Sequence, residues 1–322
     1  MADALSRQTG ARLIVADFPL RIDSRFNVEI GDADELSRSQ VRPTSTIQPT
    51  ITDTRKREEW KGERRLFSTL TVETKNEIER ELARDGRVVV FAARRGIAPL
   101  TVCNDCGTPI TDPTTGTPMV LHKTPDGNIF MSHRSGATLP SEVSCKTCRG
   151  WNLVTLGVGI ERVKEELEKS FPKVSIYSLT KDTASTHAAA KKIAAQFYGS
   201  AKTILVGTER MLPYLTEPFG TGVIASLDSM LSLPAWRAHE YALSILYFLR
   251  ERAENKFIVE TRHPDHEIMK SLVAGNPLDF YREEIKERTK YRYPPISIFI
   301  GLSIIGTRAA VDAFSETVKE QF

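Results

Sequence analysis

Four cysteines are the residues whose types and spacing most clearly indicate chemistry in this chain. They form two Cys-x2-Cys pairs, Cys103 with Cys106 and Cys145 with Cys148, separated by residues 107–144. Each Cys-x2-Cys turn brings two thiolates together, and four thiolates fill a tetrahedral site with no open position. A redox-active pair would open a helix after a strand, and neither pair has that setting. The sequence therefore predicts one structural zinc ion, with four unrelated thiols as the alternative.

The segment between the pairs is expected to be a small β structure. Residues 107–144 contain His122 and His133, but four thiolates already complete the site, so exposed polar histidines are the favoured interpretation. Two short apolar runs predict a hairpin with its turn at Asp126-Gly127, and these runs are Met119–Leu121 and Ile129–Met131. Residues 103–150 should therefore form a zinc-stabilised β-ribbon inserted in a larger domain.

Alternating helices and strands surround the expected ribbon. Short apolar runs predict strands at 88–93, 174–179, 203–206, 223–227 and 257–261. Helical periodicity predicts helices at 68–85, 160–171, 185–198, 238–253, 264–274 and 277–290. Because the two kinds of element alternate with short loops, we expect an α/β fold, a parallel sheet with helices on both faces.

Both ends of the chain have a different character. Residues 12–16 are strand-like, but residues 17–67 show little periodicity, so 1–67 is interpreted as the tail of a preceding domain plus a linker. Beyond Tyr293-Pro294-Pro295 a β segment is expected at 296–305 and a helix at 309–322. A β–α pair cannot bury its own face, so the C-terminal unit, 293–322, is expected to be truncated.

The composition of the chain excludes several classes of protein. Apolar residues make up 40% and charged residues 26%, as in an ordinary globular protein. No apolar run approaches the length of a membrane span, and the N-terminus lacks the apolar core of a signal peptide. We therefore expect a cytoplasmic protein without a membrane partner. A net charge of +3 is too small to indicate a nucleic-acid partner by itself.

Several segments, taken in order, resemble the second helicase lobe of the primosomal protein N′ (PriA) family, superfamily 2 helicases of DNA replication restart. These segments are ELARDGRVVVFAARRGIAPLTVCNDCG, CKTCRG, LGVGIERVKEELEKSFP, ILVGT, LDSMLSLPAWRAHE and HPDHEIMKSLVAGNPLDFYREE, with YPP after them. The resemblance covers about 68–305, and more faintly 11–26. It implies a RecA-like lobe in two parts, 68–102 and 151–292, interrupted by the ribbon, with 1–67 holding a remnant of the first lobe.

The chain departs from the family's pattern in its ribbon. The family's ribbon has two zinc sites built from four Cys-x2-Cys pairs, in which the outer pairs share one metal and the inner pairs the other. The outer pairs correspond to Cys103 with Cys106 and Cys145 with Cys148, and the inner pairs are absent. The resemblance thus implies a single zinc ion.

The family's ATPase motifs are also missing. The chain has no G-x-x-x-x-G-K-[ST] sequence and no Asp-Glu pair after a buried strand, so ATP and Mg²⁺ binding are doubtful. FLRERAEN replaces the family's closing G-R-A-G-R motif and places Arg252 and Asn255 at its two arginine positions. Since loss of an arginine finger costs on the order of 10³–10⁵ in rate, we assign no catalytic residue and expect no ATP hydrolysis by this chain alone.

Two loop segments are candidates for contact with DNA. Arg94 and Arg95 follow a predicted strand at the loop end of the sheet, where ligands usually bind; a solvated pair is the alternative. Gly207-Thr208 resembles the family's backbone-contacting Gly-Thr, with an ordinary strand-to-loop turn as the alternative.

The second cysteine turn carries a third candidate surface. Lys146 and Arg149 place positive charge beside Trp151, a combination that suits strand separation or base stacking. Trp151 could equally pack the ribbon onto the lobe, and packing is the favoured interpretation for this residue.

Three functions remain, and we favour the first. In the first, a degenerate PriA-like lobe with a zinc ribbon binds forked or single-stranded DNA and replication-restart proteins. In the second, the chain is half of a split 3′–5′ helicase that works with a separate first lobe carrying the Walker motif. In the third, it is a zinc-ribbon adaptor between proteins.

Overall fold

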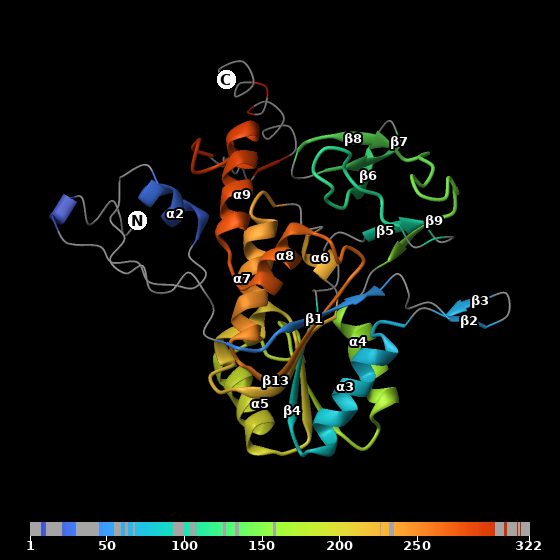
Figure 1. Cartoon of the computed structure of the whole chain (residues 1–322), viewed down its shortest axis with the longest axis vertical. Helices are drawn as coiled ribbons and strands as arrows, with labels where there is room; N and C mark the ends of the chain where they lie inside the picture. The colour runs from blue at the N-terminus through green and yellow to red at the C-terminus, as the bar shows by residue number, and fades with distance from the viewer. Residues whose placement is uncertain are drawn as a thin grey trace.

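The fold is taken from a computed structural model of the 322-residue chain. The structure describes residues 8–10, 21–29, 45–54, 59–61, 64–66, 68–92, 100–103, 106, 108–124, 127–132, 135–156, 159–225, 227–231, 235–299, 306–307, 314 and 316. Within these ranges a large α/β lobe carries a smaller antiparallel β unit on one side (Figure 1).

A six-stranded parallel sheet forms the centre of the lobe. Its strand order is β1-β13-β12-β4-β11-β10. The strands are β1 (Pro49–Asp53), β4 (Arg87–Phe91), β10 (Ser175–Leu179), β11 (Thr203–Gly207), β12 (Phe219–Ile224) and β13 (Ala253–Thr261). Every pairing in this sheet is parallel, which confirms the predicted sheet and its RecA-like α/β class.

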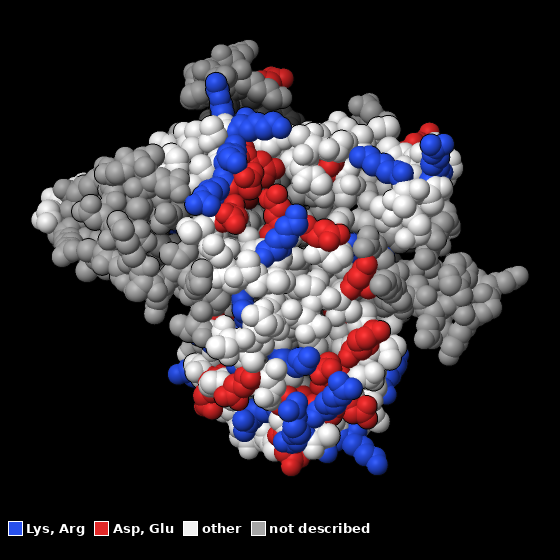
Figure 2. All heavy atoms as spheres, in the orientation of Figure 1, with Lys and Arg blue, Asp and Glu red and all other residues white. Residues whose placement is uncertain are grey.

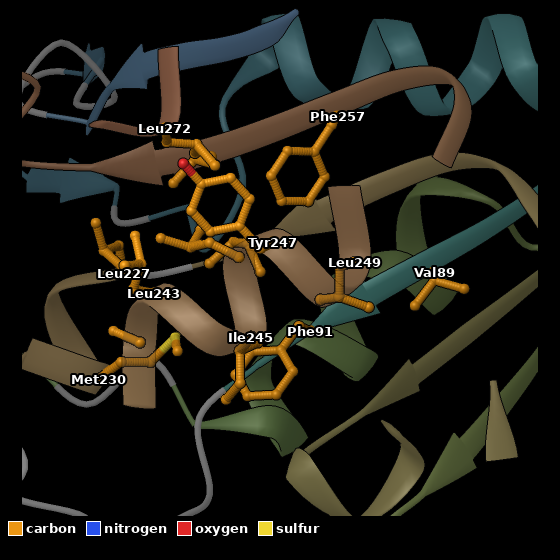
Figure 3. Packing of buried hydrophobic residues seen from close by; sticks show 14 of the residues in the cluster. Val89, Phe91, Leu227, Met230, Leu243, Ile245, Tyr247, Leu249, Phe257 and Leu272 are labelled. Atoms are coloured by element: carbon orange, nitrogen blue, oxygen red, sulfur yellow. The ribbon is translucent and has the colours of Figure 1, made fainter. Parts of the chain in front are cut away.

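Helices cover both faces of the sheet, because its inner strands are apolar at successive positions. Val88 and Val90 of β4 pack with α3 (Val72–Ala83) and α4 (Ile160–Ser170), whereas Val89 and Phe91 face the opposite cluster. That cluster includes residues of several other helices, among them α5 (His187–Gly199), α7 (Ala238–Arg250), α8 (Glu267–Ala274) and α9 (Leu278–Tyr291). Figure 3 shows Phe91 and Phe257 of the sheet beside Tyr247 and Leu249 of α7. Each buried side chain of this kind contributes roughly 1.5–3 kcal/mol.

Polar side chains fix where α3 and α8 begin. Thr71 caps α3 by accepting a hydrogen bond from the Thr74 backbone at 3.2 Å, and the buried Glu260 of β13 accepts from the Thr71 backbone at 2.8 Å. His266 caps α8 in the same way, since its Nδ1 accepts from the Ile268 backbone at 3.2 Å. These caps set the first turn of each helix, and the contact with Glu260 ties α3 to the sheet.

The smaller unit is a five-stranded antiparallel sheet of order β8-β7-β6-β5-β9. Its strands are β5 (Leu100–Cys103), β6 (Val120–Thr124), β7 (Gly127–Met131), β8 (Thr138–Pro140) and β9 (Leu153–Leu156). The predicted hairpin is confirmed as β6 with β7, where Thr124 pairs with Gly127. Because β5 pairs with β9, the ribbon's sheet reaches beyond 103–150 at both ends. Its buried apolar cluster consists of Ile110, Met119 and Phe130.

Residues 1–67 are interpreted from the sequence as the tail of a preceding domain plus a linker, but the parts of this segment that the structure describes pack onto the lobe. α2 (Ile22–Glu29) places Ile22 in the core cluster shared with α7 and α9, and β1 pairs with β13 at the sheet edge. A short antiparallel pair, β2 (Glu59–Lys61) with β3 (Arg64–Leu66), follows. The strand-like run at 12–16 lies outside the described residues.

Two other expected strands need correction. The strand expected at 223–227 is β12, which begins at Phe219 and ends at Ile224; Leu227 instead begins the helix α6 (Leu227–Leu231). The β segment expected at 296–305 is not a strand over 296–299, and the positions after 299 lie outside the described residues until 306. No helix within the described ranges is long and apolar enough to cross a membrane.

A candidate metal centre and nucleic-acid interface

The four cysteines converge on one point of the ribbon. Cys103 ends β5, Cys106 lies in the turn after it, and Cys145 and Cys148 flank the second turn. Their four sulfur atoms lie within 4.8 Å of one another. The Cys103 and Cys148 sulfurs are 3.4 Å apart, as are those of Cys106 and Cys145. This separation suits four thiolates around one ion at about 2.3 Å.

Backbone hydrogen bonds close both turns around the sulfur atoms. In the first turn the Cys103 N–H donates to the Thr108 carbonyl at 2.8 Å. In the second, the Arg149 N–H donates to the Cys145 carbonyl and the Cys145 N–H to the Gly150 carbonyl, each at 2.8 Å. Arg149 has φ of +60°, the left-handed conformation that such a tight turn needs.

The thiols perturb one another's protonation. Burial raises the pKa of Cys106, but hydrogen bonding with Thr108 and the other thiols outweighs burial and lowers this pKa to about 6. A hydrogen bond from the Gly150 backbone lowers the pKa of Cys148, but Cys106 and Cys103 raise it to about 12. A cation at the centre would displace these shared protons. The donor set therefore fits a metal ion bound by thiolates, as the sequence predicted.

The two ribbon histidines are not part of this centre as far as the structure describes them. His122 is half-buried on β6, outside the cysteine cluster. His133 lies outside the described residues.

The second cysteine turn presents its charged and aromatic residues to solvent. Lys146 and Arg149 are exposed, and Trp151 is 69% exposed. The favoured interpretation of Trp151 as a packing residue is therefore wrong, because this side chain lies on the ribbon's surface. The turn combines two positive charges with an aromatic ring that is open to a ligand.

Gly207 and Thr208 lie at the carboxyl edge of the parallel sheet. A Cβ atom at Gly207 would approach the Met211 sulfur to 2.6 Å, so the close packing of the following turn requires glycine. Thr208 lines a hollow of about 670 Å³ that lies over the ends of β10 and β11. The other lining residues include Lys181 and Arg210, but also Glu161, Asp182 and Glu209. The hollow is therefore of mixed charge rather than basic.

Of the remaining sequence-derived candidates, Arg94 and Arg95 lie outside the described residues. The two positions assigned to the closing helicase motif have structural contacts. Arg252 donates to the carbonyls of Leu215 at 2.9 Å and Phe248 at 3.1 Å. Asn255 donates to both carboxylate oxygens of the buried Glu81 at 3.1 Å. Both side chains thus bind parts of the lobe itself.

The structure also brings together a second group that the sequence pattern did not indicate, His239 with Glu284 and Glu287. The only sequence signal was two glutamates three residues apart in a predicted helix, which is common on solvated helices. The histidine comes from another helix, so their proximity depends on tertiary packing.

A RecA-like parallel sheet with a four-cysteine β-ribbon inserted after its inner strand β4 defines the class of this protein, a helicase-type lobe with a cysteine ribbon. No protein-family model matches the chain. Curated relatives do match, and three of them, from different bacteria, each bear the name replication restart protein PriA. The Bacillus subtilis protein is 28% identical over 81% of this chain, and the Rickettsia typhi protein 30% identical over 71%. The Rickettsia conorii protein is 26% identical over 93% of this chain.

The chain belongs to the PriA family. It spans about a third of the length of the Bacillus and Rickettsia typhi relatives, with 33% and 36% of their residues matched. The resemblance stated from the sequence is confirmed, and it extends over the lobe and the ribbon together.

Proposed function

We propose that this chain acts in DNA replication restart as a helicase lobe that binds forked or single-stranded DNA through its zinc ribbon. The observation that carries the proposal is the solvent-exposed Trp151 beside the exposed Lys146 and Arg149. Exposed aromatic rings stack on unpaired bases, each stack contributing about 1–3 kcal/mol, while lysine and arginine neutralise phosphates.

The ribbon's metal is proposed to be one structural Zn²⁺ held by Cys103, Cys106, Cys145 and Cys148. Its role is to hold the turn that carries Trp151 in one conformation, because four thiolates leave no coordination position for chemistry. Zinc removal should therefore weaken DNA binding indirectly, by releasing the turn.

The sheet edge is a secondary part of the proposal. Gly207, Thr208, Arg94 and Arg95 are proposed to follow the DNA backbone at the carboxyl ends of the strands, where ligands usually bind in such sheets. The acidic residues in the neighbouring hollow reduce its attraction for phosphate. We therefore expect the ribbon turn to contribute more than Gly207 and Thr208 do.

ATP hydrolysis by this chain alone is not part of the proposed function. Arg252 and Asn255 bind carbonyl and carboxylate groups of the lobe, and the chain has no sequence for a phosphate-binding loop. ATP and Mg²⁺ would then depend on a separate first lobe, which is proposed as a partner beside other replication-restart proteins. A cytoplasmic location remains a prediction.

Titration of a labelled forked DNA at several salt concentrations tests the proposal. We expect submicromolar binding with a steep salt dependence, and weaker binding after zinc chelation. Trp151→Ala should weaken binding by about 1–3 kcal/mol. Lys146→Gln with Arg149→Asn should reduce the salt slope by about 2, since each lost phosphate contact lowers it by about 1; asparagine tolerates the left-handed backbone at 149.

The matched control is Lys173→Gln, which removes an exposed lysine from the turn before β10 at the amino ends of the strands. It should leave the affinity and the salt slope almost unchanged. If the fork does not bind even at low salt, or if all three variants bind equally well, the ribbon is not a DNA-binding surface and a protein adaptor becomes the better interpretation.

A further inference from the structure

A second cluster of metal-ligating side chains lies outside the ribbon, between α7 and α9. It consists of His239 in the first turn of α7 and of Glu284 and Glu287, one turn apart on α9. One ligand atom from each residue lies within 4.8 Å of the other two. His239 is 6% exposed and Glu284 only 2% exposed, so the carboxylate and the imidazole face one another away from solvent.

A buried arginine, Arg288, is shared between this cluster and neighbouring carboxylates. The buried Arg288 donates its Nε to Oε1 of Glu284 at 3.0 Å and its Nη2 to Glu240 at 3.1 Å, and its Nη1 lies 3.6 Å from Asp23. The Arg288 guanidinium therefore lies near the carboxylates of Glu284, Glu240 and Asp23. Arg237 also pairs with Asp23 and Glu240. The second oxygen of Glu284, Oε2, points instead toward Nδ1 of His239 at 3.9 Å.

The cluster opens into a hollow of about 320 Å³ that is rich in carboxylates. Besides the three cluster residues, the described residues that line the hollow include the carboxylates of Asp265, Glu267 and Glu283 and the ammonium group of Lys270. Figure 2 shows acidic side chains beside lysine and arginine side chains on the face of the molecule that carries α8 and α9. The carboxylates that line the hollow lie beside partly desolvated ligand atoms, and this arrangement favours a bound cation.

His266 packs against His239 of the cluster and is not one of its three ligating residues. Its Nδ1 already accepts the hydrogen bond that caps α8, and its ring packs edge-on against His239 with centroids 5.2 Å apart. Thr115, from a turn of the ribbon, lines the same hollow. The cluster therefore lies where the ribbon meets the helices of the lobe.

We propose that His239, Glu284 and Glu287 form a second metal site, which binds a divalent transition-metal ion. One imidazole and two carboxylates are a mixed nitrogen and oxygen donor set, which accepts Mn²⁺ or Zn²⁺ and differs from the thiolate centre of the ribbon. Three protein ligands leave coordination positions for water. The ion links α7 to α9 at the contact with the ribbon.

Manganese distinguishes the two sites, because carboxylate and imidazole ligands suit Mn²⁺ whereas four thiolates select zinc. The full chain, with zinc in its ribbon, is titrated with Mn²⁺ alone, and free Mn²⁺ is measured by electron paramagnetic resonance. We expect one Mn²⁺ bound per chain without release of ribbon zinc. Pulsed measurements should detect a nitrogen nucleus coupled to the bound ion, and His239→Gln should remove that coupling.

Glu287→Gln should weaken Mn²⁺ binding at least tenfold, because it removes a charged ligand that is only half-buried and keeps the side chain's shape. The matched control is Glu283→Gln, which alters another carboxylate of the same helix that lines the hollow and pairs with Lys286. It should change the affinity less than twofold.

Three results would overturn the second site. They are no Mn²⁺ binding at millimolar concentration, equal losses of Mn²⁺ affinity in Glu287→Gln and Glu283→Gln, and bound Mn²⁺ without nitrogen coupling. Equal losses would mean a diffuse attraction of cations to the acidic face. Because the readout is metal binding without DNA, its failure leaves the proposed DNA-binding function intact.

Discussion

The lobe and the ribbon reach a folded state by different means. The lobe buries apolar side chains on both faces of a six-stranded sheet, where residues such as Val89, Phe91 and Phe257 are at most 2% exposed. The ribbon also has a five-stranded sheet, but among its described side chains the buried apolar cluster is small. It consists of Ile110, Met119 and Phe130, with Leu121, Leu139, Val143 and Leu153 partly buried against them. A small core of this kind seldom stabilises a β unit alone, so we expect an ion bound by the four cysteines to contribute what the lobe obtains from burial.

The difference matters for function. A surface turn that is held by a cluster of four cysteines can present Trp151, Lys146 and Arg149 to a partner without burying any of them. In the lobe, by contrast, the two residues assigned to the closing helicase motif, Arg252 and Asn255, form hydrogen bonds with other groups of the lobe. We infer that the ribbon is the region that meets the ligand, and that the lobe is the rigid element that carries it.

The largest expected effect is that of Cys145→Ser. Cys145 is 1% exposed, and structural zinc centres contribute roughly 10–16 kcal/mol of apparent binding energy, so loss of one thiolate should release the ion and unfold the ribbon locally. The zinc content measured by metal analysis should fall by one ion per chain. The amides of β6 and β7 should lose protection from hydrogen exchange, while those of β4 and β11 keep theirs.

Lys146→Gln is the control, since it changes an exposed residue of the same turn and should retain the zinc. A global loss of far-UV circular dichroism in Cys145→Ser would contradict the separation of the two regions.

The next largest effect is expected from Phe257→Ala in the lobe. Phe257 of β13 is fully buried in the core cluster between the sheet and its helices, so truncation should lower the free energy of unfolding by about 3–5 kcal/mol. Urea denaturation measures this change in the free energy of unfolding, and the zinc content per chain should not change. The same truncation in the ribbon, Phe130→Ala, should leave the lobe's unfolding midpoint unchanged; a joint shift would mean that the two cores unfold together.

The sequence predicted the inner strands and the cysteine centre because each has a local signal. β4 and β11 are continuous apolar runs, and both cysteine pairs have the spacing of a metal turn. β1 has no such signal, since Pro49–Asp53 is largely polar and becomes a strand only by pairing with β13, far along the chain. A pairing of that kind depends on tertiary contacts that no local pattern records.

Two glycines explain why the sequence did not predict the beginning of β12. Gly220 and Gly222 interrupt its apolar pattern, so the strand was expected to begin only at 223. A Cβ atom at Gly220 would come within 1.8 Å of the buried Glu81 carboxylate, and one at Gly222 within 3.1 Å of Phe219 and Phe257. These glycines make room for tertiary neighbours, as glycine in strands often does. The cluster of His239, Glu284 and Glu287 was missed for a related reason, since only tertiary packing brings its members together.

A smaller effect on stability is expected from Glu166→Gln. Glu166 lies on α4, where it contacts Lys75 of α3 on the same face of the sheet. This carboxylate accepts hydrogen bonds from the Thr69 backbone at 2.5 Å and hydroxyl at 2.6 Å, and pairs with Lys75 at 2.5 Å. Burial raises its pKa, but Lys75, Ser68 and Thr69 lower it from 4.5 to about 2. The folded pKa therefore lies below the unfolded one, and the stabilisation is complete above pH 4.5 and lost as the pH falls toward 2.

Glu166→Gln should therefore cost about 1–2 kcal/mol at pH 7, a value reduced for partial solvent screening, and progressively less below about pH 4.5. Urea titrations of both proteins across this pH range measure the difference. Glu165→Gln, on the exposed side of the same helix, should change the free energy of unfolding by less than about 0.5 kcal/mol. A penalty for Glu166→Gln that does not change with pH would mean that shape, not charge, is what Glu166 contributes.

The smallest effect on stability is expected from Trp151→Ala. A tryptophan that is 69% exposed contributes little packing, so thermal unfolding and zinc content should match those of the unmodified protein within about 0.5 kcal/mol. Fork binding should nevertheless weaken, because stacking on bases needs the aromatic ring. Trp151→Phe should retain most of the affinity, since it keeps a ring for stacking. If Trp151→Ala instead lowers the unfolding free energy by more than about 1 kcal/mol, the ring packs in solution, and the division between a buried lobe and a ligand-facing ribbon turn fails at this residue.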